Sequence, residues 1–257
     1  MSRLFRSSSS VSNRSALPPV PDIVNQEEQS YKNISQVLHN WNIPRVSPKE
    51  IYQSTFFDKF KTDYNVKTVE RVYAINKEYE NCSLLSPEVI KKHRKKGYNF
   101  IHIGLVQVAV KPLNRKGINS SIYLCLRDAR FLNYYPSIIG AMEASLHNGP
   151  IHFNCFPDFT LSLSDQNLFK ALTLNIKTDG EITQMIEGSQ PIALIYRIYY
   201  KTMKSNLNVH ALNKSPKDQT VLIQSSTSDA NIQIPRTILW KDITLPSQWT
   251  LPQELPQ

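Results

Sequence analysis

The sequence predicts a mainly β protein: an antiparallel sandwich or barrel with short helices near its N-terminus and disordered ends. Three observations support this. Short segments with the two-residue alternation of strands follow one another from Asn99 onward. Helix start signals occur only before Asn99, and both ends of the chain are rich in polar residues and proline. Closely spaced strands that follow a few helices favour an antiparallel sandwich or barrel.

The chain has 257 residues, of which 40% are hydrophobic, so it can bury a substantial core. One folded domain with flexible flanks is the simplest organisation. Residues 1–26, rich in serine, arginine and proline, are expected to form a disordered arm. A helical lead-in is expected over 27–66, the β domain over 67–211, and a linker with a proline-rich, extended tail over 212–257.

Two helices are expected ahead of the strands. Ser47 followed by Pro48, with a glutamate three residues after the serine, predicts an N-capped helix over residues 48–60. Ser86, again followed by proline, predicts a second helix that stops at Gly97. Lysine and arginine fill the last turns of this second helix, where cations suit the helix dipole.

The first clear strand runs from Asn99 to Val110, and its apolar phase changes at Gly104, which predicts a β-bulge there. Residues 138–146 fit a helix or a strand. The pair Asn148-Gly149 is typical of a hairpin turn and favours strands around it. The remaining expected strands are short and rich in apolar residues; they cover residues 122–127, 151–163, 171–178 and 191–203.

The chain is basic, with 30 Lys and Arg against 21 Asp and Glu, a formal charge of +9. Such an excess indicates either a polyanion partner or simple solubility, and charge alone does not separate the two. The longest apolar segment, residues 100–110, is shorter than the roughly 20 residues that cross a bilayer. Any membrane contact is therefore expected to be peripheral.

The three cysteines are expected to be reduced thiols, because their number is odd and no secretory segment accompanies them. Cys125 and Cys155 lie in apolar surroundings, where a free cysteine usually packs as a small core residue. Cys155 and His152 are only two of the four ligands that a structural zinc site needs. We therefore expect no metal and no cofactor.

No arrangement of residues indicates catalysis. The sequence has no glycine-rich phosphate loop and no serine nucleophile elbow. Thr178-Asp179-Gly180 has the wrong order for an aspartic protease. His102 lies inside a strand and is interpreted as a satisfied core or rim residue rather than a base. The protein is expected not to be an enzyme.

Asp128 follows the apolar strand that ends in Leu126-Arg127. Alternation puts Leu126 and Asp128 on the same face, an unusual position for an acid. A carboxylate there can accept hydrogen bonds from the following turn, or pair with Arg127 or Arg130. We therefore expect Asp128 to support the fold rather than to catalyse.

A dense basic run in the second helix is the candidate contact for nucleic acid. Five cations within six residues would meet phosphates by counterion release, which is independent of base sequence. The alternative is a solvated helix end without a partner. The residues are Lys91, Lys92, Arg94, Lys95 and Lys96.

An ordered series of motifs resembles one family. Leu126-x-Asp128 is followed by the phrase Asn154-Cys155-Phe156-Pro157, then by Gly188 and the apolar segment 191–201. This series resembles the thirty-kilodalton superfamily of plant-virus movement proteins, in the caulimovirus and badnavirus-like branch of reverse-transcribing viruses. The resemblance covers residues 67–211, and the tail over 236–251 is also similar to that branch.

The resemblance implies a jelly roll and makes Leu126, Asp128 and Gly188 the family signature, with Asp128 needed for movement. It implies a non-enzymatic carrier of nucleic acid or virions between cells, found in the host cytoplasm and plasmodesmata, the channels between plant cells. The implied partners are single-stranded nucleic acid or virion coat protein, host plasmodesmal proteins, and further copies of the chain in an oligomer or tubule. The alternatives are a capsid-like structural protein and, third, an enzyme that uses Asp128.

Overall fold

The computed structural model is mainly antiparallel β. It describes residues 43–52, 64–75, 77–113, 119–147, 149–180, 191–206, 209–212, 219–225, 233–239, 246 and 249. The arm predicted over residues 1–26 and the signature residue Gly188 lie outside this range.

The first sheet has the strand order β1-β9-β3-β6, and β7 also pairs with β3. All of these pairs are antiparallel, and β6 and β7 pair with successive parts of the long strand β3. The strands are β1 (Tyr64–Ile75), β3 (Phe100–Pro112), β6 (Ile151–Cys155), β7 (Phe159–Ser162) and β9 (Ile192–Met203).

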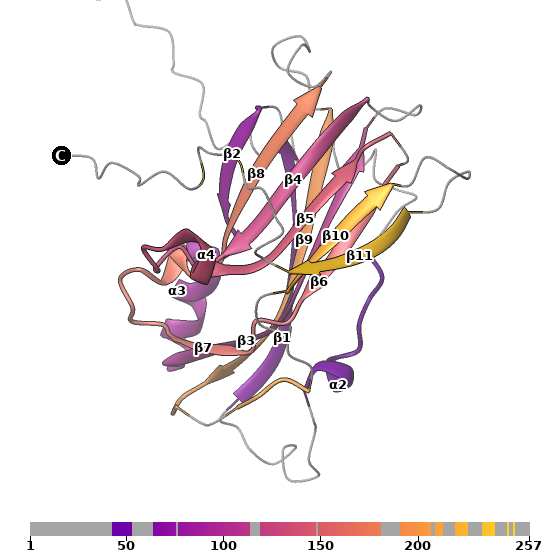
Figure 1. Ribbon diagram of the computed structural model, residues 1–257. Helices are drawn as coiled ribbons and strands as arrows, with labels where there is room; N and C mark the ends of the chain where they lie inside the picture. Colours follow the sequence, from indigo (N-terminus) through magenta and orange to yellow (C-terminus); the bar gives the residue numbers. More distant parts are fainter. Residues whose placement is uncertain are drawn as a thin grey trace, which may run out of the picture.

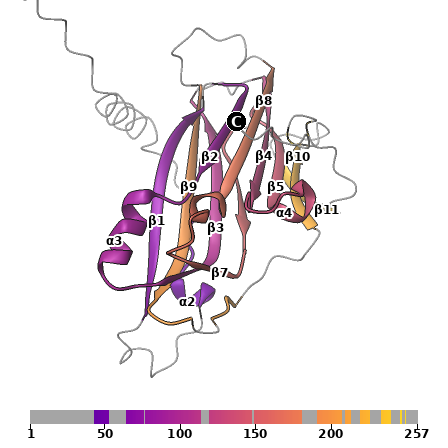
Figure 2. The same ribbon diagram turned by 90° about the vertical axis from the view of Figure 1, so that its left-hand side faces the viewer.

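The second sheet has the order β2-β8-β4-β5 and is antiparallel throughout. Its strands are β2 (Tyr79–Ser83), β4 (Ser120–Arg127), β5 (Ile138–Ser145) and β8 (Thr173–Gly180). From β1 to β9 the chain changes sheet at every connection except β4–β5 and β6–β7. Two four-strand-wide sheets with this interleaved order form a jelly roll, which confirms the expected fold (Figures 1 and 2).

The core lies between the two sheets and follows from strand alternation. In β4, Ile122, Leu124 and Leu126 are buried, while the side chains at Tyr123 and Arg127 are part-exposed. Strand β9 is buried along its whole length, because its inward side faces the core and its outer side is covered by residues 43–52. One apolar cluster therefore joins the two sheets.

Helix α2 begins where the sequence predicts and ends early. It covers Pro48–Ile51 and has the expected capping box on Ser47. Tyr52 is already extended, because its hydroxyl reaches the carbonyl oxygen of His102 at 3.0 Å. The prediction that this helix continues beyond Ile51 is therefore wrong at Tyr52. Residues 53–60, over which the helix was also predicted, lie outside the described part.

Helix α3 (Pro87–Lys95) confirms the second prediction. Ser86 caps its start, and Gly97 leaves the helix with a φ of +78°. Two single-turn elements were not predicted: α4 (Tyr134–Ser137) and the 3₁₀ helix η2 (Leu168–Lys170). Within the described residues, no helix is both long enough and apolar enough to cross a membrane.

The β-bulge expected at Gly104 is confirmed, since the pairing of β3 with β9 changes register between Ile103 and Leu105. A Cβ atom at Gly104 would lie 2.6 Å from the hydroxyl oxygen of Tyr52. Glycine therefore lets the N-terminal segment pack closely onto the sheet at this point.

The hairpin expected at Asn148-Gly149 is wrong. Residues 138–145 do form a strand, β5, but β5 pairs with β4 whereas β6 pairs with β3, so the connection crosses between the sheets. The single strand expected over 151–163 is also divided in two. Pro157 cannot donate a ladder hydrogen bond, and Asp158 turns the chain with a φ of +50°.

Two domain boundaries also differ from the expectation. Strand β1 begins at Tyr64, inside the predicted helical lead-in. Strands β10 (Gln219–Ser225) and β11 (Gln233–Leu239) form an antiparallel hairpin where the sequence predicts a linker and tail. This hairpin lies beside β5 (Figure 1).

Candidate functional site

Three segments meet at one end of the sandwich, which we call the helical end: residues 86–99 with α3, the turn 128–137 with α4, and the loop 163–172 with η2. Strands β4 and β7 end there, and β3, β5 and β8 begin there. The amide of Ala129 donates to the carbonyl of Lys170 at 2.8 Å, and the amide of Leu163 donates to the carbonyl of Asn99 at 2.8 Å. These bonds join the three segments.

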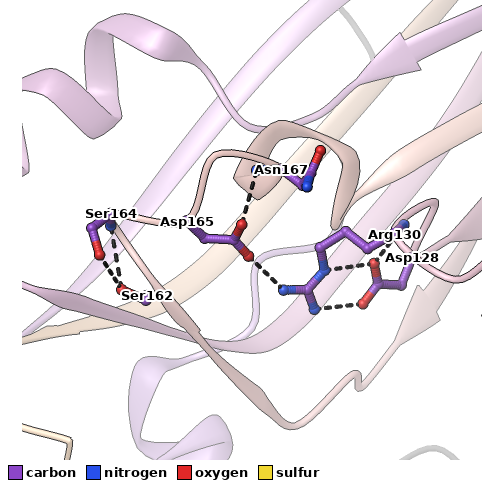
Figure 3. A network of polar contacts seen from close by, with 6 residues as sticks. All are labelled: Asp128, Arg130, Ser162, Ser164, Asp165 and Asn167. Atoms are coloured by element: carbon purple, nitrogen blue, oxygen red, sulfur yellow. Dashed lines mark hydrogen bonds and ion pairs between the residues drawn. The ribbon is translucent and has the colours of Figure 1, made fainter.

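Asp128 lies directly after β4 and is 5% exposed. Its Oδ1 accepts from Nε of Arg130 at 2.9 Å, and its Oδ2 accepts from Nη2 at 2.6 Å (Figure 3). Oδ1 also accepts from the backbone amide of Arg130 at 3.1 Å. The expected support of the turn and the expected pairing with Arg130 are both present. Arg127 is placed differently, with its guanidinium 4.4 Å from the ring centroid of Tyr134.

The backbone of Asp128 closes the same turn. Its amide donates to the carbonyl of Ser137 at 2.7 Å, and its carbonyl accepts from the amide of Phe131 at 3.2 Å. The side chain and the backbone of Asp128 thus fix both ends of the β4–β5 connection. Leu126, two residues earlier, is fully buried in the core between the sheets.

Arg130 continues the network to the loop 163–172. Its Nη1 donates to Oδ2 of Asp165 at 3.1 Å, and the amide of Asn167 donates to Oδ1 of Asp165 at 2.8 Å (Figure 3). The hydrogen bonds that Arg130 donates to Asp128 raise the pKa of Arg130 above its usual value. The Asn167 amide, and then Arg130, hold the pKa of Asp165 below its usual value. The guanidinium of Arg130 thus pairs with both Asp128 and Asp165 and joins the turn 128–137 to the loop 163–172.

Helix α3 turns one face inward and presents its cations to solvent. Ile90 and His93 are buried, and Nε2 of His93 lies 2.9 Å from the hydroxyl oxygen of Tyr200 in β9. Burial raises the pKa of Tyr200 to about 12. The guanidinium of Arg94 donates to the carbonyl of Leu163. Lys91, Lys92, Lys95 and Lys96 are exposed.

A polar cluster on the outer side of the first sheet was not predicted. Nδ1 of His102 lies 3.0 Å from the hydroxyl of Tyr52, and its Nε2 faces Oδ1 of Asp158 at 3.3 Å. Nδ1 of His210 lies 3.4 Å from Oδ2 of Asp158, and the Ala211 amide donates to Oδ1 at 2.6 Å. The cluster therefore joins four segments that are distant in the sequence. Asp158 has a left-handed backbone, with a φ of +50°.

Burial dominates the electrostatics of this cluster. It lowers the pKa of His102, although Asp158 opposes that change. Burial acts to raise the pKa of Asp158, but the Ala211 amide and the two imidazoles hold it below its usual value. His102 is thus a buried residue, as expected from the sequence, and its Nδ1 lies within hydrogen-bond distance of Tyr52. Its Nε2 makes an ion-pair contact with Asp158 but no hydrogen bond, so the expectation of a fully satisfied histidine holds for one ring nitrogen.

The outer face of the second sheet carries a small apolar cluster of Cys125, Tyr134 and Ala141. The ring of Trp249 stacks on Tyr134 with centroids 6.4 Å apart. Burial raises the pKa of Cys125 to about 12 and also raises that of Cys155, so both thiols stay protonated. In the described part of the chain, no three His, Cys, Asp or Glu residues lie together as metal ligands.

Comparison with known proteins gives a family match. The model of the family described as "Viral movement protein (MP)" matches residues 35–219. The genome polyprotein of Petunia vein clearing virus (isolate Shepherd) is 30% identical over 186 residues, which are 69% of this chain and 8% of the polyprotein. The movement protein of Carnation etched ring virus is 31% identical over 118 residues, 46% of this chain and 36% of that protein.

A third relative is the movement protein of Soybean chlorotic mottle virus, 30% identical over 125 residues, which are 49% of this chain and 41% of that protein. The match therefore covers less than half of each of these relatives. Among solved structures, one described as desmodium yellow mottle tymovirus covers 82% of this chain and 99% of its own, with a TM-score of 0.39 and 10% identity. A score this low supports no inference, so the jelly-roll assignment rests on the strand order.

Proposed function

This chain belongs to the viral movement protein family, and from that premise we propose that it is a non-enzymatic carrier that takes nucleic acid or virions from cell to cell through plasmodesmata. The carrier binds nucleic acid without sequence specificity and associates with copies of itself. The branch resemblance is confirmed by movement proteins of caulimoviruses among the relatives, including those of Figwort mosaic virus and Cauliflower mosaic virus.

The observation that carries the proposal is the exposed basic face of α3. Three lysines of this nine-residue helix and Lys96 at its C-cap face solvent, while Ile90 and His93 anchor the opposite side. Lysine carries a compact positive charge on a flexible stem, and this charge attracts backbone phosphates whatever the base sequence. Backbone contacts of this kind give affinity without sequence preference, as a carrier of whole genomes requires.

A non-enzymatic role fits the chemistry of Asp128. Both of its carboxylate oxygens accept from Arg130, and the side chain is 7% exposed. A carboxylate held this way stabilises a turn and is poorly placed to exchange protons with a substrate. The same geometry supports a role in presenting the helical end to a partner.

The remaining partners follow from family membership. We propose that the cargo is single-stranded nucleic acid or a virion recognised through its coat protein, and that host plasmodesmal proteins receive the carrier. The working form is a homo-oligomer or tubule, and the places of action are the host cytoplasm and the plasmodesmata.

Binding to nucleic acid tests the proposal directly. Two unrelated single-stranded DNA oligonucleotides of equal length should bind the full chain with equal affinity, measured by fluorescence anisotropy. Affinity should fall steeply with salt because bound phosphates release counterions. A strong preference for one sequence, or no binding at low salt, would contradict the carrier model.

A capsid-like structural protein is the second candidate, and the interleaved strand order of the jelly roll favours it. Electron microscopy of the purified chain separates the two. Closed shells would support a coat protein, whereas tubules, or nucleic-acid complexes without shells, would support a carrier.

A further inference from the structure

A short N-terminal segment, residues 43–46, lies on the outer side of the first sheet, and we call it the strap. Ile43 is 1% exposed and packs against β3 and β9 at one end of the strap, and Val46 packs against the same two strands at the other end. The surface beneath, which we call the strap face, consists of three cross-strand pairs of β3 and β9. They are Ala109 with Ile195, Gln107 with Arg197, and Leu105 with Tyr199.

The polar pair in the middle of the strap face binds the strap through its backbone. Nη1 of Arg197 donates to the carbonyl oxygens of Ile43 and Pro44, each at 3.3 Å. Nε2 of Gln107 donates to the carbonyl oxygen of Pro44 at 3.1 Å. Pro44 and Arg45 are exposed. The strap face therefore recognises carbonyl groups and an apolar side chain at each end of the strap, and not the side chains between them.

The amide of Val46 completes this recognition. It donates to the hydroxyl oxygen of Tyr199 at 3.2 Å. Of the four residues of the strap, the first and the fourth thus supply the apolar contacts, and both are β-branched. Any extended segment with β-branched residues three positions apart, and with a free carbonyl between them, offers the strap face the same groups.

The chain contains a second segment of this kind. Ile-Pro occurs at two places in the sequence, Ile43-Pro44-Arg45-Val46 and Ile234-Pro235-Arg236-Thr237, and both continue with arginine and a β-branched residue. The proline in each restricts the preceding isoleucine to an extended backbone. We call residues 234–237 the second motif.

The second motif lies in a part of the fold that can open. It belongs to β11, which forms a two-stranded sheet with β10, separate from the two sheets of the sandwich. The hairpin lies beside β5 (Figure 1). Pro235 cannot donate a ladder hydrogen bond, and a two-stranded hairpin has little stability of its own. The second motif can therefore leave its strand at less cost than a strand inside either sheet.

We propose that the strap face of one copy of the chain binds the second motif of another copy in place of its own strap. Ile234 takes the position of Ile43, and the carbonyl of Pro235 takes that of the Pro44 carbonyl. Each copy then offers one face and one motif, so the contact is head-to-tail and extends into open chains of copies. This inference rests on the self-association proposed above and names the surface that produces it.

The strap competes with the second motif for the same face. Because the strap belongs to the same chain as the face, its effective concentration is in the millimolar range. Exchange between copies therefore requires a high local concentration of the chain, or a weakened strap. The strap thus keeps dilute copies apart and gives way as copies accumulate.

Peptide binding to the full chain tests the strap face. The protein carries Ile43→Asp, which weakens the strap, and the labelled peptide has the sequence of residues 232–238. Fluorescence anisotropy should show binding that is at least about tenfold weaker for the same peptide with Ile234→Asp, because one buried isoleucine is lost. The wild-type chain should bind the peptide more weakly than the Ile43→Asp chain. Equal binding of the two peptides would overturn the proposal, and Ile43→Ala replaces Ile43→Asp if that variant does not fold.

Sedimentation velocity over a series of chain concentrations tests the exchange between copies. Ile234→Asp should lower the association constant by at least about tenfold, and Ile43→Asp should raise it. Ile238→Asp, which places the same charge in β11 outside the second motif, is the matched control and should associate as wild type. Self-association that Ile234→Asp leaves unchanged would overturn the exchange and leave the proposed self-association intact. A wild-type chain that stays monomeric at every concentration would contradict both.

Discussion

At the residue scale, Asp128 joins the two halves of one turn to each other and to a neighbouring loop. An acid at a strand end, followed two residues later by arginine, is enough to predict a local pair, because neither side chain has to reach far. The third member, Asp165, comes from a loop 35 residues away and could not be predicted. The local sequence therefore predicts the pair of Asp128 with Arg130 but not the pair of Arg130 with Asp165.

Substitution of Asp128 separates its charge from its shape. Asp128→Ala should lower the free energy of unfolding by roughly 1 to 3 kcal/mol, because the amide of Arg130 and its guanidinium lose their acceptor. Asp128→Asn keeps one acceptor and should cost less. Urea denaturation measures both changes.

The matched control for this pair of variants is Asp179→Asn, which removes a more exposed carboxylate paired with Lys177 and should cost at most about 1 kcal/mol. A stable Asp128→Asn protein that no longer supports spread between cells would assign the charge to a partner surface. Wild-type stability of Asp128→Ala would refute the turn-supporting role.

His102 provides a prediction with pH. Burial holds the pKa of His102 below its usual value in the folded protein; Asp158 opposes this, while His210 and Lys201 reinforce it. The folded state therefore binds fewer protons than the unfolded chain. The resulting stabilisation is complete above the unfolded pKa of about 6.5 and is lost as the pH falls through the folded pKa.

The free energy of unfolding should accordingly fall as the pH is lowered from about 7.5 to about 5.5. The pKa of His152 is also lowered, because its imidazole is partly desolvated although the residue is exposed, and this adds to the same trend. His102→Gln should reduce the slope, measured by urea denaturation at a series of pH values, whereas the exposed His147→Gln should leave it unchanged. A protein that becomes more stable over this range on acidification would contradict the assignment.

At the element scale, α3 shows what local signals can and cannot reveal. Both of its ends could be predicted, the start from a serine cap with a following proline and the end from a glycine. Nothing local indicated that His93, in the middle of the basic run, would turn inward onto Tyr200. The basic run could be predicted from the sequence. Which side of the helix faces solvent depends on its packing against β9, which no local pattern encodes.

The basic face of α3 should set the salt dependence of nucleic-acid binding. Glutamine at Lys91, Lys92, Arg94, Lys95 and Lys96 should weaken binding to single-stranded DNA. Each lost phosphate contact should lower the slope of log affinity against log salt by about 0.7. Anisotropy titrations over a range of salt concentrations measure the slope, and circular dichroism checks the fold.

A control for this variant removes cations away from the helical end: Arg45→Gln, Lys49→Gln and Lys77→Gln together, all of which are exposed. The control should change the slope much less per charge removed. Equal effects of the two variants would mean that net charge, and not the α3 face, governs binding.

The elements that the sequence missed share a physical cause. Strand β2 is polar at most of its positions and gains its place only by pairing with β8, almost a hundred residues later. Strands β10 and β11 lie in a polar region that reads as a linker. In contrast, β3, β4 and β9 are rich in apolar residues, either alternating or in continuous runs, and could be recognised from their own sequences.

At the scale of the whole molecule, periodicity predicted antiparallel strands but left sandwich and barrel open. The order of the strands in each sheet depends on pairings between distant segments, such as β1 with β9, and no local pattern encodes them. The jelly roll was therefore expected only from the family resemblance. The helical end illustrates the same limit, since three segments that are separate in the sequence form it.

The central claim is that this chain carries cargo between cells and that the α3 face contributes to that transport. The most direct measurement supplies the chain in trans to a fluorescent viral genome that lacks its own movement protein, and scores spread from single cells in leaf epidermis. Wild-type chain should restore spread and give puncta in the walls between cells, while the five-glutamine α3 variant, expressed to the same level, should not. Failure of the stably expressed wild-type chain to restore any spread would contradict the account.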